Sequence, residues 1–382
     1  MKLIYIVNQR LPIEKAYSIQ IVKMCEAFAL KGLDVVLLFP SRKNPSGKTV
    51  FEYYGVKNNF KAVKLPTLDF HFPGRLDRWA VNIKNLISGL TIFLYVLFKK
   101  SDIIFSRDEL PLYFLSFFKE NLVFEAHKFS SRRIGFYRRF KKAGFKIVTI
   151  SKGLRDEFIK FGYEPERVLV AHDGVDLHQF NVSLSEGECR NKVGLPKDKK
   201  IIGYVGQLKT MGMEKGIGSL IQAVGGLSVN HPDILLVIVG GSDIDLKSYQ
   251  SFAQEKGMSD KVLFLGWKKH EDIPYYLGAF DVLAMPFPNK PHYALYMSPL
   301  KLFEYMASGR PIVATDLPTV REVLNPDNSV LVEPDNDGKF ARGVELVLTN
   351  PELSKRISAQ ALNDVENYTW NARATKVLEF IK

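Results

Sequence analysis

Short apolar strands alternate with amphipathic helices along all 382 residues, and this alternation constrains the fold more than any other feature. Each expected strand is a continuous apolar run, as in a strand covered on both faces. In the first half the runs are Leu3–Val7, Val35–Phe39, Ile103–Ser106, Leu122–Glu125, Lys146–Ile150 and Val168–Ala171. In the second half they are Ile201–Val205, Leu235–Val239, Val262–Leu265, Val282–Met285, Ile312–Ala314 and Val330–Val332. With helices between them, clearest at 18–31 and 153–161, they predict two doubly wound parallel sheets, an α/β fold.

The chain is long enough for two domains, each with a full core. Polar, turn-rich sequence occurs at residues 183–187 and 195–200 and indicates the boundary. We therefore expect a first Rossmann-like domain over residues 1–180, a linker over 181–199 and a second Rossmann-like domain over 200–369.

The positive charge lies in the first half of the chain. Residues 1–180 hold 30 Lys and Arg against 17 Asp and Glu, whereas the whole chain carries +12. The charge is densest over residues 132–142, where aromatic residues lie between the cations. Such a surface suits an anionic membrane or an acidic ligand, and the ordinary alternative is a solvated face. No nucleic-acid-binding module accompanies it, so we expect no nucleic acid partner.

One stretch, Val81–Phe98, is a candidate for membrane contact. Lys84 and several polar residues shorten its clean apolar run to Leu90–Phe98, too short for a bilayer of about 30 Å. We expect a core helix or a surface-lying helix that ends at Lys99. The aromatic loop 70–79 before it, which carries Arg75 and Arg78, could touch lipid or a hydrophobic acceptor.

The two cysteines and the N-terminus bear on location. Cys25 and Cys189 are far apart and belong to no CxxC or Cys/His cluster, which fits a reducing compartment and disfavours structural zinc. Residues 2–7 are typical of a buried strand and too short for the apolar region of a signal peptide. We expect a cytoplasmic protein, peripheral at the inner face of the membrane.

Glycines follow three successive strands of the second half: Gly206, Gly240 and Gly266. Ligands bind at the carboxyl ends of such strands, and glycine lets backbone approach them closely. Lys215 lies near the start of the next helix, where it could meet a phosphate. The first strand ends without a GxGxxG sequence, which disfavours a nicotinamide dehydrogenase.

Residues 298–304, Ser-Pro-Leu-Lys-Leu-Phe-Glu, predict a helix start. Ser298 suits the N-cap, Pro299 suits the first helical position, and Gly309 marks the end. The free N–H groups at such a start suit a diphosphate. Glu304 lies about 9 Å further along the axis, at roughly 1.5 Å per residue, where a carboxylate could hold ribose hydroxyls. The alternative is an ordinary crossover helix with a surface glutamate.

Together these pieces resemble the retaining, nucleotide-sugar-dependent glycosyltransferases of family 4 (glycosyl transferases group 1). Residues 206–216 are similar to the family's phosphate loop, and residues 304–314 to its Glu-Ala-Met-Ala-x-Gly-x-Pro signature. Residues 150–155 and 173–176 resemble the crossing between domains, and residues 368–370 the return of the last helix, about 370–382, to the first domain. The resemblance implies the GT-B fold, with two Rossmann-like domains facing a deep cleft.

The resemblance also implies roles for single residues. His127, Glu304 and Lys215 would be catalytic: His127 near the transferred sugar, Glu304 on the donor ribose and Lys215 on the diphosphate. Trp267 would meet the base edge through backbone. The donor-binding set is Gly206, Gln207, Lys209, Gly240, Trp267, Tyr296, Met297, Ser298, Pro299, Leu300 and Lys301. The acceptor-side set is Arg10, Lys15, Ala16 and Tyr17.

Three positions depart from the family pattern. Tyr296 stands where the family's Glu-x7-Glu motif has its first glutamate, and a tyrosine cannot accept hydrogen bonds as a carboxylate does. Gln207 stands where arginine is common, which leaves one cation fewer for the diphosphate. Residues 14–18 replace a Gly-Gly loop on the acceptor side.

The implied reaction transfers a sugar to an acceptor hydroxyl with retained configuration, without a metal or cofactor. Lys215 and the helix start would meet the charge on the leaving diphosphate, which can itself take the acceptor proton. The two domains are expected to close on the donor. A basic first domain suits a lipid-linked or phosphate-bearing glycan acceptor in cell-surface polysaccharide or lipid-linked glycan assembly. The alternatives are a catalytically silent nucleotide-sugar-binding subunit, because of Tyr296, and a nucleotide-sugar 2-epimerase.

Overall fold

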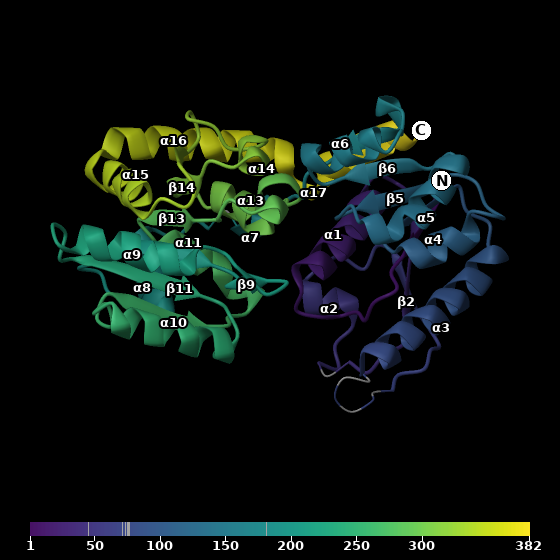
Figure 1. Ribbon diagram of the computed structural model, residues 1–382, viewed down its shortest axis with the longest axis horizontal. Helices are drawn as coiled ribbons and strands as arrows, with labels where there is room; N and C mark the ends of the chain where they lie inside the picture. The colour runs from purple at the N-terminus through teal and green to yellow at the C-terminus, as the bar shows by residue number, and fades with distance from the viewer. Residues whose placement is uncertain (45, 71, 73, 75–76, 181) are drawn as a thin grey trace. The chain divides into compact units, whose positions relative to one another are not determined.

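The computed structural model describes residues 1–44, 46–70, 72, 74, 77–180 and 182–382. The chain forms two compact units (Figure 1). Unit 1 comprises Met1–Asp173 and Trp370–Lys382, and unit 2 comprises Gly174–Thr369. Part of the loop expected to touch lipid, including Arg75, lies outside the described residues.

Unit 1 is built on a seven-stranded sheet in the order β3-β2-β1-β4-β5-β6-β7, with every neighbouring pair parallel. The strands are β1 (Lys2–Ile6), β2 (Asp34–Pro40), β3 (Lys61–Leu65), β4 (Ile103–Ser106), β5 (Leu122–Ala126), β6 (Lys146–Thr149) and β7 (Val168–Val170). The six strands expected from the sequence are confirmed. The seventh, β3, was not expected because Lys61 and Lys64 interrupt its apolar run, as is common on an edge strand.

Helices flank this sheet: α1 (Ala16–Leu30), α2 (Val50–Tyr54), α3 (Asp77–Leu97), α4 (Glu109–Leu115), α5 (Ile134–Lys142), α6 (Lys152–Lys160) and α17 (Trp370–Ile381). Short 3-10 turns lie at Ser131–Arg133 and Pro165–Arg167. Helix α3 has 21 residues, more than the apolar run that the sequence analysis counted. By length and composition it could cross a membrane, yet it packs on α4 and on strands β2 and β3.

Unit 2 carries a parallel sheet of six strands in the order β12-β11-β8-β13-β14-β15. The strands are β8 (Lys200–Val205), β11 (Ile234–Val239), β12 (Val262–Gly266), β13 (Val282–Met285), β14 (Ile312–Thr315) and β15 (Val330–Val332). All six were expected, so two doubly wound parallel α/β sheets are confirmed. An additional antiparallel hairpin, β9 (Lys209–Thr210) with β10 (Met213–Glu214), is too short to leave a sequence pattern.

The helices of unit 2 include one in the segment expected to be a linker. They are α7 (Leu177–Phe180), α8 (Glu186–Val193), α9 (Ile217–Ser228), α10 (Asp243–Glu255), α11 (Ile273–Ala279), α12 (Pro291–Leu295), α13 (Leu300–Ala307), α14 (Pro318–Arg321), α15 (Asp337–Thr349) and α16 (Pro351–Asp364), with 3-10 turns at His270–Asp272 and Val365–Tyr368. Ser185 and Glu188 form a capping box at the start of α8, and Cys189 is buried in the unit 2 core. Residues 186–193 are therefore a packed helix and not a free linker.

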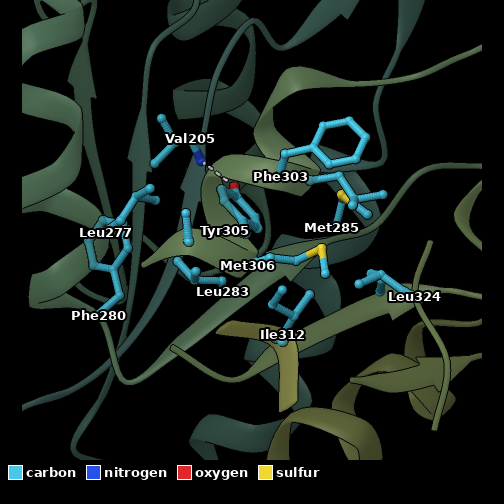
Figure 2. Packing of buried hydrophobic residues seen from close by; sticks show 14 of the residues in the cluster. Val205, Leu277, Phe280, Leu283, Met285, Phe303, Tyr305, Met306, Ile312 and Leu324 are labelled. Carbon is cyan, nitrogen blue, oxygen red and sulfur yellow. Dashed lines mark hydrogen bonds between the residues drawn. The ribbon is translucent and has the colours of Figure 1, made fainter. Parts of the chain in front are cut away.

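The core of unit 2 fixes α13 against the sheet. Phe303, Tyr305 and Met306 point from α13 into a cluster with Leu283, Met285 and Ile312 of the strands (Figure 2). The backbone N–H of Val205, the last residue of β8, donates to Tyr305 Oη over 2.8 Å (Figure 2). This hydrogen bond joins α13 to the carboxyl end of β8.

A buried ion pair attaches the C-terminal helix to unit 1. Arg373 Nη2 on α17 donates to Glu125 Oε1 on β5 over 2.7 Å, and both residues are buried. Glu125 also accepts from Tyr5 Oη at 2.8 Å and from Gln20 Nε2. Burial by itself would raise the pKa of Glu125, but Arg373 and His127 hold it well below its usual range.

Replacing Arg373 by methionine should destabilise unit 1, because Glu125 would keep its charge in the core without its main counter-charge. We expect a loss of about 3–5 kcal/mol. Urea unfolding, monitored by hydrogen exchange of the unit 1 amides, measures this loss in the free energy of unfolding. Lys376→Met makes a similar change at an exposed position of the same helix and should cost little. Equal losses in the two variants would show that the pair does not hold α17.

Candidate functional site

Three strand ends of unit 2 come together through backbone alone. Gly206 N–H donates to Val239 O over 2.8 Å, and Gly240 N–H donates to Gly266 O over 2.7 Å. A Cβ on Gly240 would lie 2.5 Å from Gly206 O, and the φ angle of Gly240 is +108°. No side chain larger than hydrogen fits there. The predicted convergence of glycines at the carboxyl ends of β8, β11 and β12 is therefore present.

The most unusual side chain at this edge is Lys301, the second residue of α13. It is 8% exposed, and its Nζ is buried without a hydrogen-bond partner. A Cβ on Gly206 would lie 3.1 Å from this Nζ, which also lies 3.5 Å from the centroid of the Tyr204 ring. Burial, and then the nearby charge of Lys215, lower the pKa of Lys301 well below its ordinary value.

Lys215 supplies a second cation at the same edge. It follows β10 and precedes Gly216, the N-cap of α9, whose φ is +82°. A Cβ on Gly216 would lie 1.8 Å from Pro286 O, so the turn needs glycine. Burial lowers the pKa of Lys215 to about 8. Two desolvated ammonium groups that repel one another form a site that an anion would stabilise.

Glu304 lies one turn further along α13 and is held by a neighbour. Its Oε1 is 3.2 Å from His270 Nε2, and its side chain is 13% exposed. Gln179 Nε2 lies 2.9 Å from His270 Nδ1. Because the amide NH₂ donates to Nδ1, the proton of a neutral His270 is on Nε2 and is donated to Glu304. Sequence reasoning missed His270 and Gln179, since nothing in the local pattern links them to Glu304.

The start of α13 differs by one residue from the expectation. Ser298 is not the N-cap: Pro299 has extended backbone angles there, and the helix begins at Leu300. The N-cap residue Pro299 makes no side-chain hydrogen bond to this end, and the N–H of Leu302 donates to Pro299 O over 3.0 Å. A helix start of this kind presents N–H groups and a partial positive charge to an anion. The helix ends at Ser308–Gly309, as expected. Tyr296 and Met297 lie just before it, after α12.

The other predicted donor residues, Lys209, Gln207 and Trp267, differ in their contacts and exposure. Lys209 Nζ lies 2.9 Å from Asp245 Oδ1, so its charge is already paired. Gln207 accepts a hydrogen bond from Tyr204 Oη at its backbone oxygen, and Trp267 follows β12 with its side chain exposed. Residues 243–245 read Asp-Ile-Asp at the start of α10, but no group of three or more His, Cys, Asp or Glu that could hold a metal occurs within the described chain.

In unit 1, His127 follows β5 and lies beside the buried ion pair. Its Nε2 is 3.1 Å from Glu125 Oε1, and its side chain is 19% exposed. Burial, and then Arg107, lower the pKa of His127 to about 4 in spite of Glu125. A neutral ring that donates from Nε2 to Glu125 leaves Nδ1 as an acceptor. Glu125 and Arg107 were not predicted, because their importance comes from long-range contacts.

The predicted acceptor-side residues lie at and before the start of α1. Lys15 is the N-cap and Ala16 the first helical residue. The Arg107 guanidinium lies 5.3 Å from the centroid of the Tyr17 ring, and burial raises the pKa of Tyr17. Arg10 donates weakly to Lys43 O at 3.4 Å. Arg107 therefore connects Tyr17 with the Gln20–Glu125 cluster, since it also donates to Gln20 Oε1 over 2.8 Å.

Comparison with known proteins agrees with this arrangement. Residues 18–179 match the family described as Glycosyltransferase Family 4, and residues 185–364 match Glycosyl transferases group 1. A relative from Methanocaldococcus jannaschii, the uncharacterized glycosyltransferase MJ1607, is 29% identical over 244 residues, which are 62% of this chain and 60% of that protein. This chain thus spans less than two thirds of that relative's length.

Solved structures share the fold over nearly the full chain. A glycosyltransferase from Rickettsia africae has a TM-score of 0.77 at 16% identity and covers 100% of this chain and 97% of its own. Anabaena Alr3699/HepE in complex with UDP has a TM-score of 0.74 at 17% identity, with 99% of both chains covered. At such identities the likeness shows the fold, which is GT-B.

The lowered pKa of His127 leads to a pH prediction. Above about pH 6.5 the ring is neutral in both folded and unfolded chains. As the pH falls toward 4, the unfolded chain takes up a proton that the folded chain does not, so stability should drop by up to about 3 kcal/mol. Nuclear magnetic resonance titration should place the His127 midpoint near 4. His127→Gln assigns the signal and should flatten the acid limb of the stability curve. A midpoint near 6.5 would contradict the buried, neutral ring.

Proposed function

Because the chain belongs to the family 4 glycosyltransferases of group 1, we propose that it transfers a sugar from a nucleoside diphosphate sugar to an acceptor hydroxyl and retains the anomeric configuration. The observation that carries this proposal is the unpartnered Nζ of Lys301, buried beside the glycine strand ends and close to Lys215. A diphosphate would bring both cations hydrogen-bond acceptors and more negative charge than the Glu304 carboxylate alone provides. The related fold of HepE, solved with UDP, supports a nucleoside diphosphate as the ligand.

The donor would bind along the carboxyl edge of the unit 2 sheet. Its phosphates would contact Lys301, Lys215 and the N-terminal end of α13, and Glu304, held by His270, would accept from the ribose hydroxyls. In this arrangement Lys301 replaces the arginine that the family commonly has at the position of Gln207. The base would lie along the backbone near Trp267.

The reaction would break the bond between the anomeric carbon and the diphosphate oxygen and form a bond from the same carbon to the acceptor oxygen on the same face. The acceptor proton would pass to the departing phosphate oxygen, so no protein base is needed. Lys215, Lys301 and the helix start would stabilise the charge on the diphosphate, and the proposed reaction therefore needs neither metal nor cofactor. Nδ1 of His127 would accept a hydrogen bond from a hydroxyl of the transferred sugar.

The acceptor would bind to unit 1, near Arg10, Lys15, Ala16 and Tyr17. The excess of cations in this half of the chain favours a lipid-linked or phosphate-bearing glycan. We propose a cytoplasmic enzyme, peripheral at the inner membrane face, in the assembly of a cell-surface polysaccharide or a lipid-linked glycan.

Thermal unfolding of the protein with a panel of nucleoside diphosphates and their sugars, UDP first, tests the donor site. One nucleotide should stabilise the native state, by about 2.7 kcal/mol at a concentration of 100 times its Kd. Glu304→Ala should abolish the shift, and Glu271→Ala, an exposed glutamate of the neighbouring 3-10 turn, should keep it. If no nucleotide shifts the melting temperature of the folded protein, the assignment is wrong. Binding without transfer to any acceptor would favour the silent subunit, and a product formed from the donor alone would favour an epimerase.

Lys301→Met should change stability and binding in opposite directions. Without ligand the variant should be more stable by about 1–3 kcal/mol, because a buried unsatisfied group is removed. Its affinity for the nucleoside diphosphate should fall at least about tenfold, the equivalent of 1.4 kcal/mol. Thermal unfolding and isothermal calorimetry measure the two effects. Lys209→Met, whose ammonium is already paired, should lower affinity less. Unchanged affinity in Lys301→Met would refute a phosphate contact.

A further inference from the structure

Helix α3 of unit 1 differs from an ordinary surface helix, whose polar side faces water. Its inner face includes polar groups beside the buried Ala80, Ile92 and Val96. Lys84 is buried, with Nζ 3.6 Å from Asp69 Oδ1, and Ser88 is buried and donates to Asn8 Oδ1. Arg42 Nη2 donates to Asn85 Oδ1 over 3.0 Å. These contacts tie the polar side of α3 to the rest of unit 1.

The outer side of α3 is apolar. Exposed side chains recur every three or four residues along one face and continue just beyond the helix: Trp79, Ile83, Leu86, Leu90, Leu94 and Phe98, between 37% and 81% exposed. The row extends over about 30 Å at roughly 1.5 Å per residue. A row of large apolar side chains in water marks a surface that binds a partner.

Two aromatic residues that follow α4 widen this row. Phe117 and Phe118 are exposed, and the Phe118 ring lies 5.7 Å from the ring of Phe93 on α3. Helix α4 packs on both α3 and α5 (Figure 1). We define the α3 face as the six residues of the row together with Phe117 and Phe118.

Cations border the α3 face. The Arg139 guanidinium lies 3.9 Å from the centroid of the Phe117 ring, and Lys119 Nζ donates to Lys99 O at the end of α3. Helix α5, Ile-Gly-Phe-Tyr-Arg-Arg-Phe-Lys-Lys, has four cations and no carboxylate. An apolar face with a basic border has the chemistry that binds the surface of an anionic bilayer. The same border disfavours a second copy of the chain, because like charges would meet across a two-fold interface.

We propose that α3 lies flat in the interfacial layer of an anionic lipid bilayer, with the α3 face toward the acyl chains. The helix does not cross the bilayer: Ala80, Ile92 and Val96 are fully buried in unit 1, and Lys84 and Ser88 keep their partners there. The proposed function places the protein at the membrane, and this proposal names the surface that would bind there. It does not depend on transferase activity.

Flotation of the full chain with lipid vesicles tests the proposal. Vesicles of phosphatidylcholine with phosphatidylglycerol should carry the protein, and vesicles of phosphatidylcholine alone should carry less. Leu90→Glu combined with Leu94→Glu should lower partition at least about tenfold, because both exposed side chains would otherwise be buried in lipid. Val229→Glu combined with Ile244→Glu, two exposed apolar residues of unit 2, should not change it. Arg138→Gln with Lys142→Gln should weaken binding to the anionic vesicles only, more at low salt.

Each outcome decides the question. Loss of flotation in the α3 variants, with their melting temperature and nucleotide binding unchanged, supports the docking surface. Equal flotation of the α3 and unit 2 variants overturns it. Concentration-dependent dimers that the α3 variants dissociate, with no vesicle binding, would make a second copy the occupant and also overturn it. Failure of nucleotide binding in the unmodified chain would count against the proposed function alone.

Discussion

The desolvation of Lys301 is the physical constraint on which the proposed donor site of unit 2 depends. Its Nζ is buried beside Gly206 without a hydrogen-bond partner, and Lys215 adds repulsion to the loss of water. The chain can hold this arrangement because α13 is fixed by apolar packing and by the hydrogen bond between Val205 and Tyr305, neither of which involves the cation. Stability lost at one side chain is thus offset by the core around it, as is common at sites built for a ligand.

In unit 1 the buried carboxylate of Glu125, unlike the buried ammonium of Lys301, has hydrogen-bond partners. Glu125 is buried even more deeply than Lys301, yet it receives hydrogen bonds from Arg373, Tyr5 and Gln20 and lies next to His127. A carboxylate so fully paired stabilises a particular arrangement of chain segments and orients its neighbours. Here it joins α17 to the sheet and occupies one nitrogen of His127, whose ring is kept neutral by burial and by Arg107. The same ion pair therefore serves both the architecture of unit 1 and the orientation of its candidate catalytic residue.

The sequence predicted the sheets well because buried parallel strands are continuous apolar runs, and all twelve expected strands are present. The edge strand β3 was missed because Lys61 and Lys64 face solvent, and α8 was missed although Ser185 and Glu188 show the spacing of a capping box. For the candidate site, motif order singled out Lys215 and Glu304, and their roles stay predictions. It could not locate His270 or Arg107, whose contacts join residues far apart in the sequence, nor reveal that Lys301 lacks a partner.

Helix α3 shows why the partner of a side chain matters more than its type. An apolar stretch with one lysine has the same sequence signature whether it lies in a core, crosses a bilayer or rests on its surface. In the structure Lys84 and Ser88 have their partners within unit 1, and large apolar side chains of α3 are exposed. The buried Nζ of Lys301, which has no hydrogen-bond partner, and the exposed apolar row on α3 are comparable observations. The ammonium group is in an unfavourable environment because it is desolvated, and the apolar row because it is exposed to water. The ligands that we propose follow from this chemistry: an anion for unit 2 and a lipid surface for unit 1.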